Sequence, residues 1–140
     1  GSRVALNVEI KSPASDWPNL VPRLLHTLSA HGAGEATVVS CFEMEALAAV
    51  RARSATMRLG VLWQHTEFAE AWRWVKELRA QSIHPHWMLA SAEVVQAAHG
   101  RGLQVLVWTV NEVPAMLQLL RHGVDGLISD FPERFADLCG

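Results

Sequence analysis

The sequence predicts an α/β fold in which strands and helices alternate around a parallel sheet, as in a segment of a TIM (β/α)8 barrel. Short apolar runs rich in β-branched residues alternate with longer segments of helical period, which is typical of βα units. The run Gln104–Val110 is apolar on both faces, as expected for a strand covered on both sides. Neither a Gly-x-Gly-x-x-Gly pattern nor a P-loop follows any strand, so a barrel is favoured over a doubly wound nucleotide-binding sheet.

The elements are expected in regular alternation, with little room for a long linker. The strands are expected at Val4–Ile10, Thr37–Cys41, Arg58–Trp63, Ser82–His84, Gln104–Val110 and Gly126–Ser129. The helices are expected at Pro18–His31, Glu43–Arg53, Glu67–Arg79, Ser91–Arg101, Glu112–Arg121 and Pro132–Leu138.

Local patterns mark several helix ends. Asn111 is the expected N-cap of a helix with a proline in its first turn, and Asp130 with Glu133 reads as a capping box. Ser40 or Glu43 is expected to cap the helix after the second strand. Three glycines just past helical runs are expected C-caps: Gly32, Gly102 and Gly123.

Composition excludes several classes of protein. The 140 residues are 50% hydrophobic and 19% charged, which suits one packed domain. The net charge of −2 is spread along the chain, so no nucleic-acid partner is expected, and no apolar run approaches the roughly 20 residues of a membrane span. Cys41 and Cys139 form no CxxC pair, which favours a cytoplasmic location. Gly1-Ser2, without a methionine, is typical of residues left by cloning.

Polar side chains at the first strand suggest a site. Asn7, Glu9 and Lys11 share one face by period-two geometry, and the carboxyl ends of barrel strands carry the chemistry of TIM-barrel enzymes. A carboxylate beside an ammonium suits a metal ligand next to an anion-binding group. The alternative is an ion pair that only satisfies itself.

Other candidates follow later strands. Phe42 is expected at the rim, either as an apolar wall for a small substrate or as simple packing, and Trp108 is expected to point inward as core or as a substrate platform. The His84-Pro85-His86 segment has metal-like spacing, but the proline and the lack of a local third ligand disfavour zinc. We assign His84 instead to substrate orientation. No Gly-x-Ser-x-Gly elbow supports a serine nucleophile.

Five segments of the sequence form a recognisable series: Leu6-Asn7-Val8-Glu9-Ile10-Lys11, Val38-Val39-Ser40-Cys41-Phe42, Ile83-His84-Pro85, Val107-Trp108-Thr109-Val110-Asn111 and Gly123-Val124-Asp125-Gly126-Leu127-Ile128-Ser129-Asp130-Phe131-Pro132. Taken together, they resemble the C-terminal part of the glycerophosphodiester phosphodiesterase family. They occur in the family's order and spacing, with Cys41 where the family usually has a second serine.

The resemblance implies the C-terminal portion of a TIM (β/α)8 barrel that hydrolyses glycerophosphodiesters to glycerol 3-phosphate and an alcohol with a divalent cation, Ca²⁺ or Mg²⁺. It implies that Glu9 is a metal ligand and that Lys11 holds the substrate phosphate. It also implies that Phe42 and Trp108 line the glycerol side.

The family's His-Arg-Gly, Pro-Glu-Asn-Thr and Glu-x-Asp motifs and its second histidine do not occur in this sequence. A complete barrel needs about 250 residues. We therefore expect residues 1–140 to be a partial domain that is inactive alone and that self-associates or pairs with a missing N-terminal half. Two alternatives are a noncatalytic half-barrel that serves binding or assembly, and an unrelated α/β-barrel enzyme.

Overall fold

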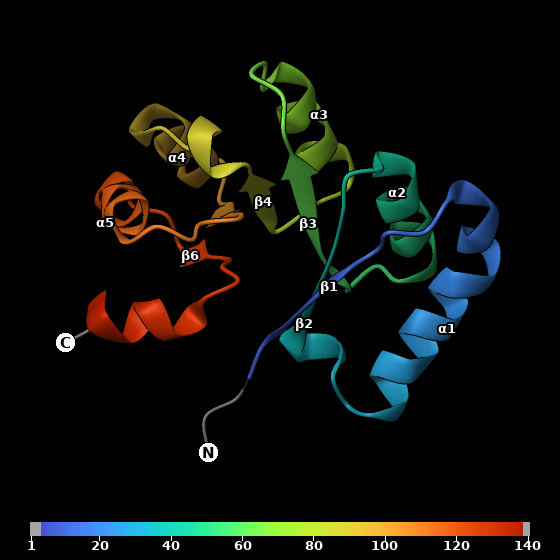
Figure 1. The fold of residues 1–140 in the computed structure, drawn as a ribbon. Helices are drawn as coiled ribbons and strands as arrows, with labels where there is room; N and C mark the ends of the chain where they lie inside the picture. Colours follow the sequence, from blue (N-terminus) through green and yellow to red (C-terminus); the bar gives the residue numbers. More distant parts are fainter. Residues whose placement is uncertain (1–3, 139–140) are drawn as a thin grey trace.

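The computed structural model describes residues 4–138, so Gly1, Ser2 and Cys139 lie outside the described residues. Within them, six parallel strands form one curved sheet in the order β1 to β6 (Figure 1). The strands are β1 (Leu6–Glu9), β2 (Thr37–Cys41), β3 (Arg58–Trp63), β4 (Ser82–Pro85), β5 (Gln104–Val107) and β6 (Gly126–Leu127). Each strand is hydrogen-bonded to the next in sequence, which confirms the predicted parallel α/β fold.

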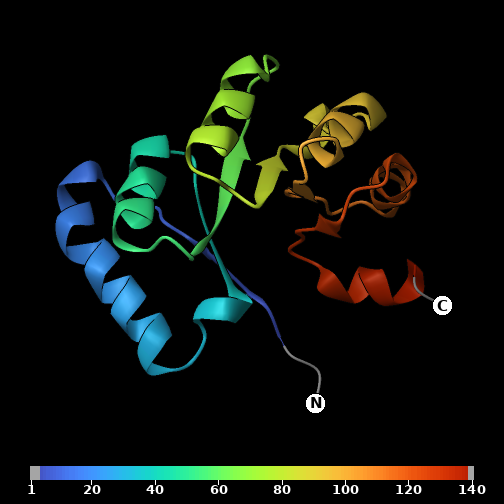
Figure 2. The ribbon, with the colours of Figure 1, turned by 180° about the vertical axis from the view of Figure 1, so that it is seen from behind.

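The helices lie in an arc outside the curved sheet, as Figure 1 and the reverse view in Figure 2 both show. The α-helices are α1 (Trp17–Ala30), α2 (Met44–Arg53), α3 (Ala69–Glu77), α4 (Ala92–His99) and α5 (Val113–His122). Short 3₁₀ segments are η1 (Ala14–Asp16), η2 (Gly34–Ala36), η3 (Trp87–Leu89) and η4 (Pro132–Leu138). Among residues 4–138, we find no helix that is long and apolar enough to cross a lipid bilayer.

The hydrophobic core lies between the helices and the convex face of the sheet. Val39, Val61 and Ile83 are fully buried there, together with helix residues such as Leu47 and Met116. Because successive strand side chains point to opposite faces, the intervening residues project onto the concave face. Those residues include Ser40, Gly60, Ser82 and His84, which the sheet therefore collects on the side away from the helices.

Several strands are shorter than predicted because a strand is hydrogen-bonded only as far as the neighbouring strand extends. β1 begins at Leu6, whose partner Thr37 is the first residue of β2. β5 ends at Val107, after which Trp108 forms a single bridge to His86. The predicted last helix, Pro132–Leu138, is a 3₁₀ helix.

The glycine C-caps are confirmed. Of the predicted N-caps, Glu43 does occupy the N-cap position of α2, without a side-chain hydrogen bond, whereas Asn111 and Ser40 do not cap a helix. Gly32, Gly102 and Gly123 have φ angles of 62°, 72° and 87°, the left-handed conformation that a helix C-cap requires.

Asn111 serves the segment after β6 instead of capping α5. Its amide nitrogen donates to Asp130 Oδ2 at 2.9 Å, and its side-chain oxygen accepts from Ser129 Oγ and from the Asp130 backbone N–H, both at 3.1 Å. Asp130 is therefore hydrogen-bonded to Asn111 and does not form the predicted capping box with Glu133. Ser40 is buried within β2, so it cannot cap α2.

Candidate functional site

The site begins with a hollow of about 620 Å³ at the carboxyl ends of β1 and β2. In a barrel, this edge of the sheet carries the catalytic loops. The strand ends deliver polar groups to the hollow, and the loop before α1 forms its far wall. Its lining includes Glu9, Lys11, Ser12, Trp17, Cys41, Phe42 and Glu43.

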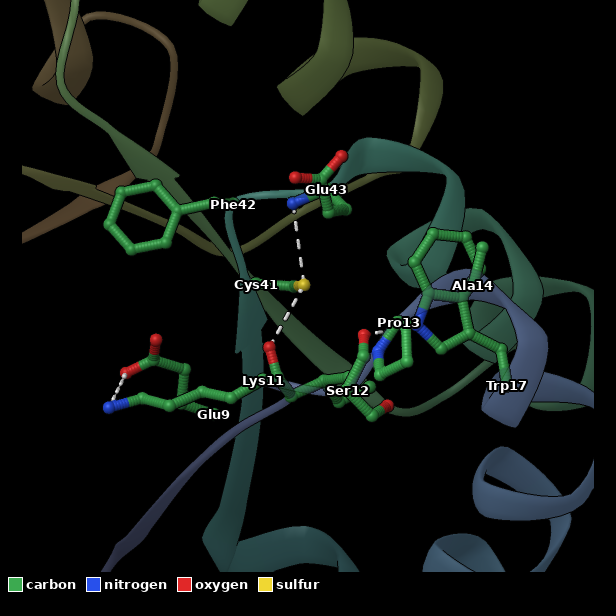
Figure 3. Close-up of a pocket in the computed structure, with 10 residues that line it drawn as sticks. Glu9, Lys11, Ser12, Pro13, Ala14, Trp17, Cys41, Phe42 and Glu43 are labelled. Atoms are coloured by element: carbon green, nitrogen blue, oxygen red, sulfur yellow. Dashed lines mark hydrogen bonds and ion pairs between the residues drawn. The ribbon is translucent and has the colours of Figure 1, made fainter.

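Glu9 and Lys11 form an ion pair, with Lys11 Nζ lying 3.7 Å from Glu9 Oε2. Both side chains extend to the same side as the Phe42 ring, as Figure 3 shows. The Lys11 side chain is 77% exposed and that of Glu9 is 29% exposed. Exposed pairs contribute little to stability, so either group exchanges its partner at small cost. The predicted shared face is confirmed for Glu9 and Lys11, and the ion pair of the alternative interpretation is also present.

Cys41 joins the ends of β1 and β2 through its thiol. Cys41 Sγ donates to the Ile10 carbonyl at 3.2 Å and accepts from the Glu43 backbone N–H at 3.3 Å. Burial raises the pKa of this thiol, and the charges of Glu43 and Glu9 act in the same direction. The thiol is therefore a structural link at neutral pH, since only the thiolate is a strong nucleophile.

An aromatic cluster extends the site toward β4 and β5. Trp108 meets Phe42 at a centroid distance of 5.2 Å and His86 at 5.1 Å, with interplanar angles of 89° and 83°. The Trp108 Nε1–H donates to the His84 carbonyl at 2.7 Å, which holds the indole over the end of β4. These contacts confirm the predicted inward orientation of Trp108.

His84 itself lies in the buried concave layer. Its ring is fully buried, and its Nε2 lies 2.8 Å from Ser82 Oγ. Its Nδ1 has no hydrogen-bond partner among residues 4–138. Burial lowers the pKa of His84 to about 4, so the ring is neutral at physiological pH. The substrate role assigned to His84 stays a prediction, and the rim position belongs to His86.

Spacing along the sequence does not distinguish His84 from His86. Both alternate onto one face, but β4 ends at Pro85, so His84 lies within the strand and His86 follows it at the rim. The bridge between His86 and Trp108 is a contact between separate βα units, which local spacing does not reveal.

Gly60 makes room for the His84 ring. A Cβ added at Gly60 would lie 2.5 Å from His84 Nε2 and 2.7 Å from His84 Cε1. We expect Gly60→Ala to lower the free energy of unfolding by about 1–3 kcal/mol, the usual cost of overpacking a core. Chemical denaturation would measure the loss. Gly34→Ala is the matched control, because an added Cβ there meets no atom within 4 Å in residues 4–138, and an equal loss in both variants would contradict the steric explanation.

Glu9 is the one metal ligand that the family resemblance implies for the described residues. No group of three or more His, Cys, Asp or Glu side chains within residues 4–138 is arranged to hold a metal ion. Glu9 offers oxygen ligands of the type that Ca²⁺ and Mg²⁺ prefer, but Ca²⁺ alone takes six to eight of them.

Comparison with known proteins decides the family. The model of the glycerophosphoryl diester phosphodiesterase family matches residues 2–134. The chain belongs to this family. A glycerophosphodiester phosphodiesterase from Caldanaerobacter subterraneus subsp. tengcongensis is 28% identical over 133 residues, which cover 95% of this chain and 54% of the relative. Another, from Bacillus altitudinis, is 26% identical over 95% of this chain and 55% of its own length.

Solved structures of phosphodiesterases share the fold. An Oleispira antarctica phosphodiesterase in complex with the product sn-glycerol-3-phosphate superposes with a TM-score of 0.87 at 22% identity, over 96% of this chain and 55% of that chain. The six curved strands thus correspond to part of a glycerophosphodiester phosphodiesterase TIM barrel. The chain spans about half the length of the curated relatives it matches.

Proposed function

We propose that this chain is the C-terminal part of an enzyme that hydrolyses glycerophosphodiesters to glycerol 3-phosphate and an alcohol with the help of a divalent cation. The Glu9–Lys11 ion pair and the contact between Phe42 and Trp108 lie at the same edge of the sheet, and this juxtaposition carries the assignment. Membership of the family supports the choice of substrate class.

Glu9 is one ligand of the cation in this proposal, either Ca²⁺ or Mg²⁺. Its partly exposed carboxylate at the mouth fits a hard cation, but one carboxylate binds such an ion weakly. The other ligands and the general acid and base then come from a part of the protein outside residues 1–140. When bound, the cation would polarise a phosphoryl oxygen of the substrate.

Lys11 holds the substrate phosphate, and the aromatic residues line the glycerol side. The Lys11 ammonium is well exposed, and its ion pair with Glu9 is weak for that reason. A phosphate oxygen can therefore replace Glu9 as the partner of Lys11 at small cost. Its charge stabilises the negative charge that develops on the phosphoryl oxygens. Phe42 and Trp108 offer apolar surface to the carbon skeleton of glycerol. His84 contributes through its carbonyl, which positions Trp108.

The proposed partner of this half-barrel is the N-terminal half of the same barrel. β1 and β6 are the outer strands of the described sheet, and unpaired strand edges favour association. The alternative is self-association of the 140-residue chain through these edges. Sedimentation velocity of this chain at high concentration would detect such self-association. The proposal also includes a cytoplasmic location, on the cysteine content alone.

Hydrolysis of glycerophosphocholine tests the proposed function. The full-length gene product should release glycerol 3-phosphate in the presence of Ca²⁺ or Mg²⁺, and a chelator should stop the release. The 140-residue chain alone should be inactive. Failure of the full-length product to hydrolyse any glycerophosphodiester with either cation would overturn the assignment. A native gene that encodes only this segment would overturn the half-barrel part of it.

One observation favours a second candidate, a noncatalytic half-barrel for binding or assembly. Residues 4–138 hold no cluster of three metal-ligating groups. A full-length product that binds glycerol 3-phosphate without hydrolysing its diesters would support this alternative.

A further inference from the structure

We propose that His86 binds the substrate by donating a hydrogen bond from Nε2 to a hydroxyl group of the glycerol moiety, an inference that rests on the proposed function. His86 therefore recognises the glycerol moiety of the substrate and not the alcohol leaving group. Three features of His86 carry the inference: its protonation, its position on the rim, and its neighbours.

The hydrogen bond at Nδ1 decides where the ring carries its proton. His86 Nδ1 accepts from the Met88 backbone N–H at 3.3 Å, which caps the short η3 helix. A neutral imidazole has one donor and one acceptor nitrogen, so its proton lies on Nε2. Within residues 4–138, Nε2 makes no hydrogen bond. The ring therefore presents a donor that is available for a ligand.

The strand places this donor at the mouth of the barrel. Ser82 and His84 lie on the concave side of β4, and His86, the next residue of this alternation, directly follows the strand and bridges to Trp108. Ser82 and His84 are buried, whereas His86 is half-buried. The side chain is thus within reach of a ligand that lies on the rim.

The neighbours of His86 indicate which part of the substrate it meets. Phe42 lines the same hollow as Glu9 and Lys11 and contacts Trp108, which in turn contacts His86. With the phosphate held at Lys11, the glycerol carbons lie along Phe42 and Trp108. A glycerol hydroxyl is then the group that arrives at His86 Nε2. Ligand sites combine apolar walls with a few placed polar groups in this way.

Two substitutions separate substrate binding from the helix cap. His86→Gln places an amide N–H at the reach of Nε2 and loses the Nδ1 acceptor, whereas His86→Asn keeps an acceptor at the reach of Nδ1 and loses the Nε2 donor. We would measure kcat/KM of the full-length gene product for glycerophosphocholine and for propyl phosphocholine, which lacks the glycerol hydroxyls. His31→Asn, an exposed site after α1, is the matched control.

For glycerophosphocholine, His86→Asn should lose roughly tenfold in kcat/KM, while His86→Gln should stay within about threefold of the wild type. For propyl phosphocholine, both variants should equal the wild type, because the hydrogen bond has no hydroxyl to reach. The loss in kcat/KM of His86→Asn should be the same for glycerophosphoethanolamine as for glycerophosphocholine, since His86 faces the glycerol side.

Other outcomes overturn the inference. If His86→Gln is the slower variant and His86→Asn retains activity, His86 acts only as the cap of η3. If both substrates lose equally in His86→Asn, the effect is structural, and a fall in melting temperature would accompany it. A wild-type protein that hydrolyses no glycerophosphodiester defeats the proposed function itself, which distinguishes that failure from the failure of His86.

Discussion

Replacing Glu9 with glutamine in the full-length protein is expected to lower kcat/KM for glycerophosphocholine at least a hundredfold, or about 3 kcal/mol in the activation free energy. Glutamine has nearly the same shape but no charge, so it would hold a divalent cation poorly. Because Glu9 is partly exposed and its ion-pair partner Lys11 is well exposed, loss of the pair should leave the fold intact. Steady-state kinetics across a titration of Ca²⁺ or Mg²⁺ and the circular dichroism spectrum would measure both effects.

Glu77→Gln is the matched control for this experiment. Glu77 forms an exposed ion pair with Arg73 at 3.6 Å on α3, so the substitution removes the same charge from a similar pair away from the mouth. Its kinetics should equal those of the wild type. If Glu9→Gln is also unchanged, Glu9 has only the structural role of pairing with Lys11.

Acid is expected to destabilise the protein through His84. Burial lowers the pKa of His84 from 6.5 to about 4 in the folded state. Between these values the unfolded chain binds the proton and the folded one does not, so the free energy of unfolding falls as the pH drops from about 6.5 to about 4. The pKa difference corresponds to about 3 kcal/mol, fully lost only below pH 4. Urea denaturation at a series of pH values would measure this slope.

His84→Asn should remove this part of the pH dependence, whatever its effect on stability at neutral pH. His26→Gln is the control, because His26 is exposed on α1 and should leave the slope unchanged. The His84 ring can also be followed by NMR in the wild-type protein, where it should remain neutral down to about pH 5. A His84 resonance that titrates near pH 6.5 would contradict its burial.

Local pattern was sufficient to place Glu9 and Lys11 together, because a strand puts alternate residues on one face whatever surrounds it. The same rule put His84 and His86 on one face but did not say which one is buried. Asn111 illustrates the opposite case. Its sequence context is that of an N-cap, but Ser129 and Asp130, which follow another strand, compete for its side chain and take it.

The sequence alone determined the order of strands and helices, the two faces of each strand, and the segments that mark the glycerophosphodiester phosphodiesterase family. Only the tertiary structure decided which of these residues meet. Phe42, His86 and Trp108 come from three different βα units. Trp108 contacts both of the others because the sheet curves and its indole reaches across β4 to the His84 carbonyl. Hydrophobic periodicity is a property of one segment at a time, whereas several segments form the rim of a barrel. The contacts at the rim therefore depend on the curvature that packing against the helices imposes on the sheet.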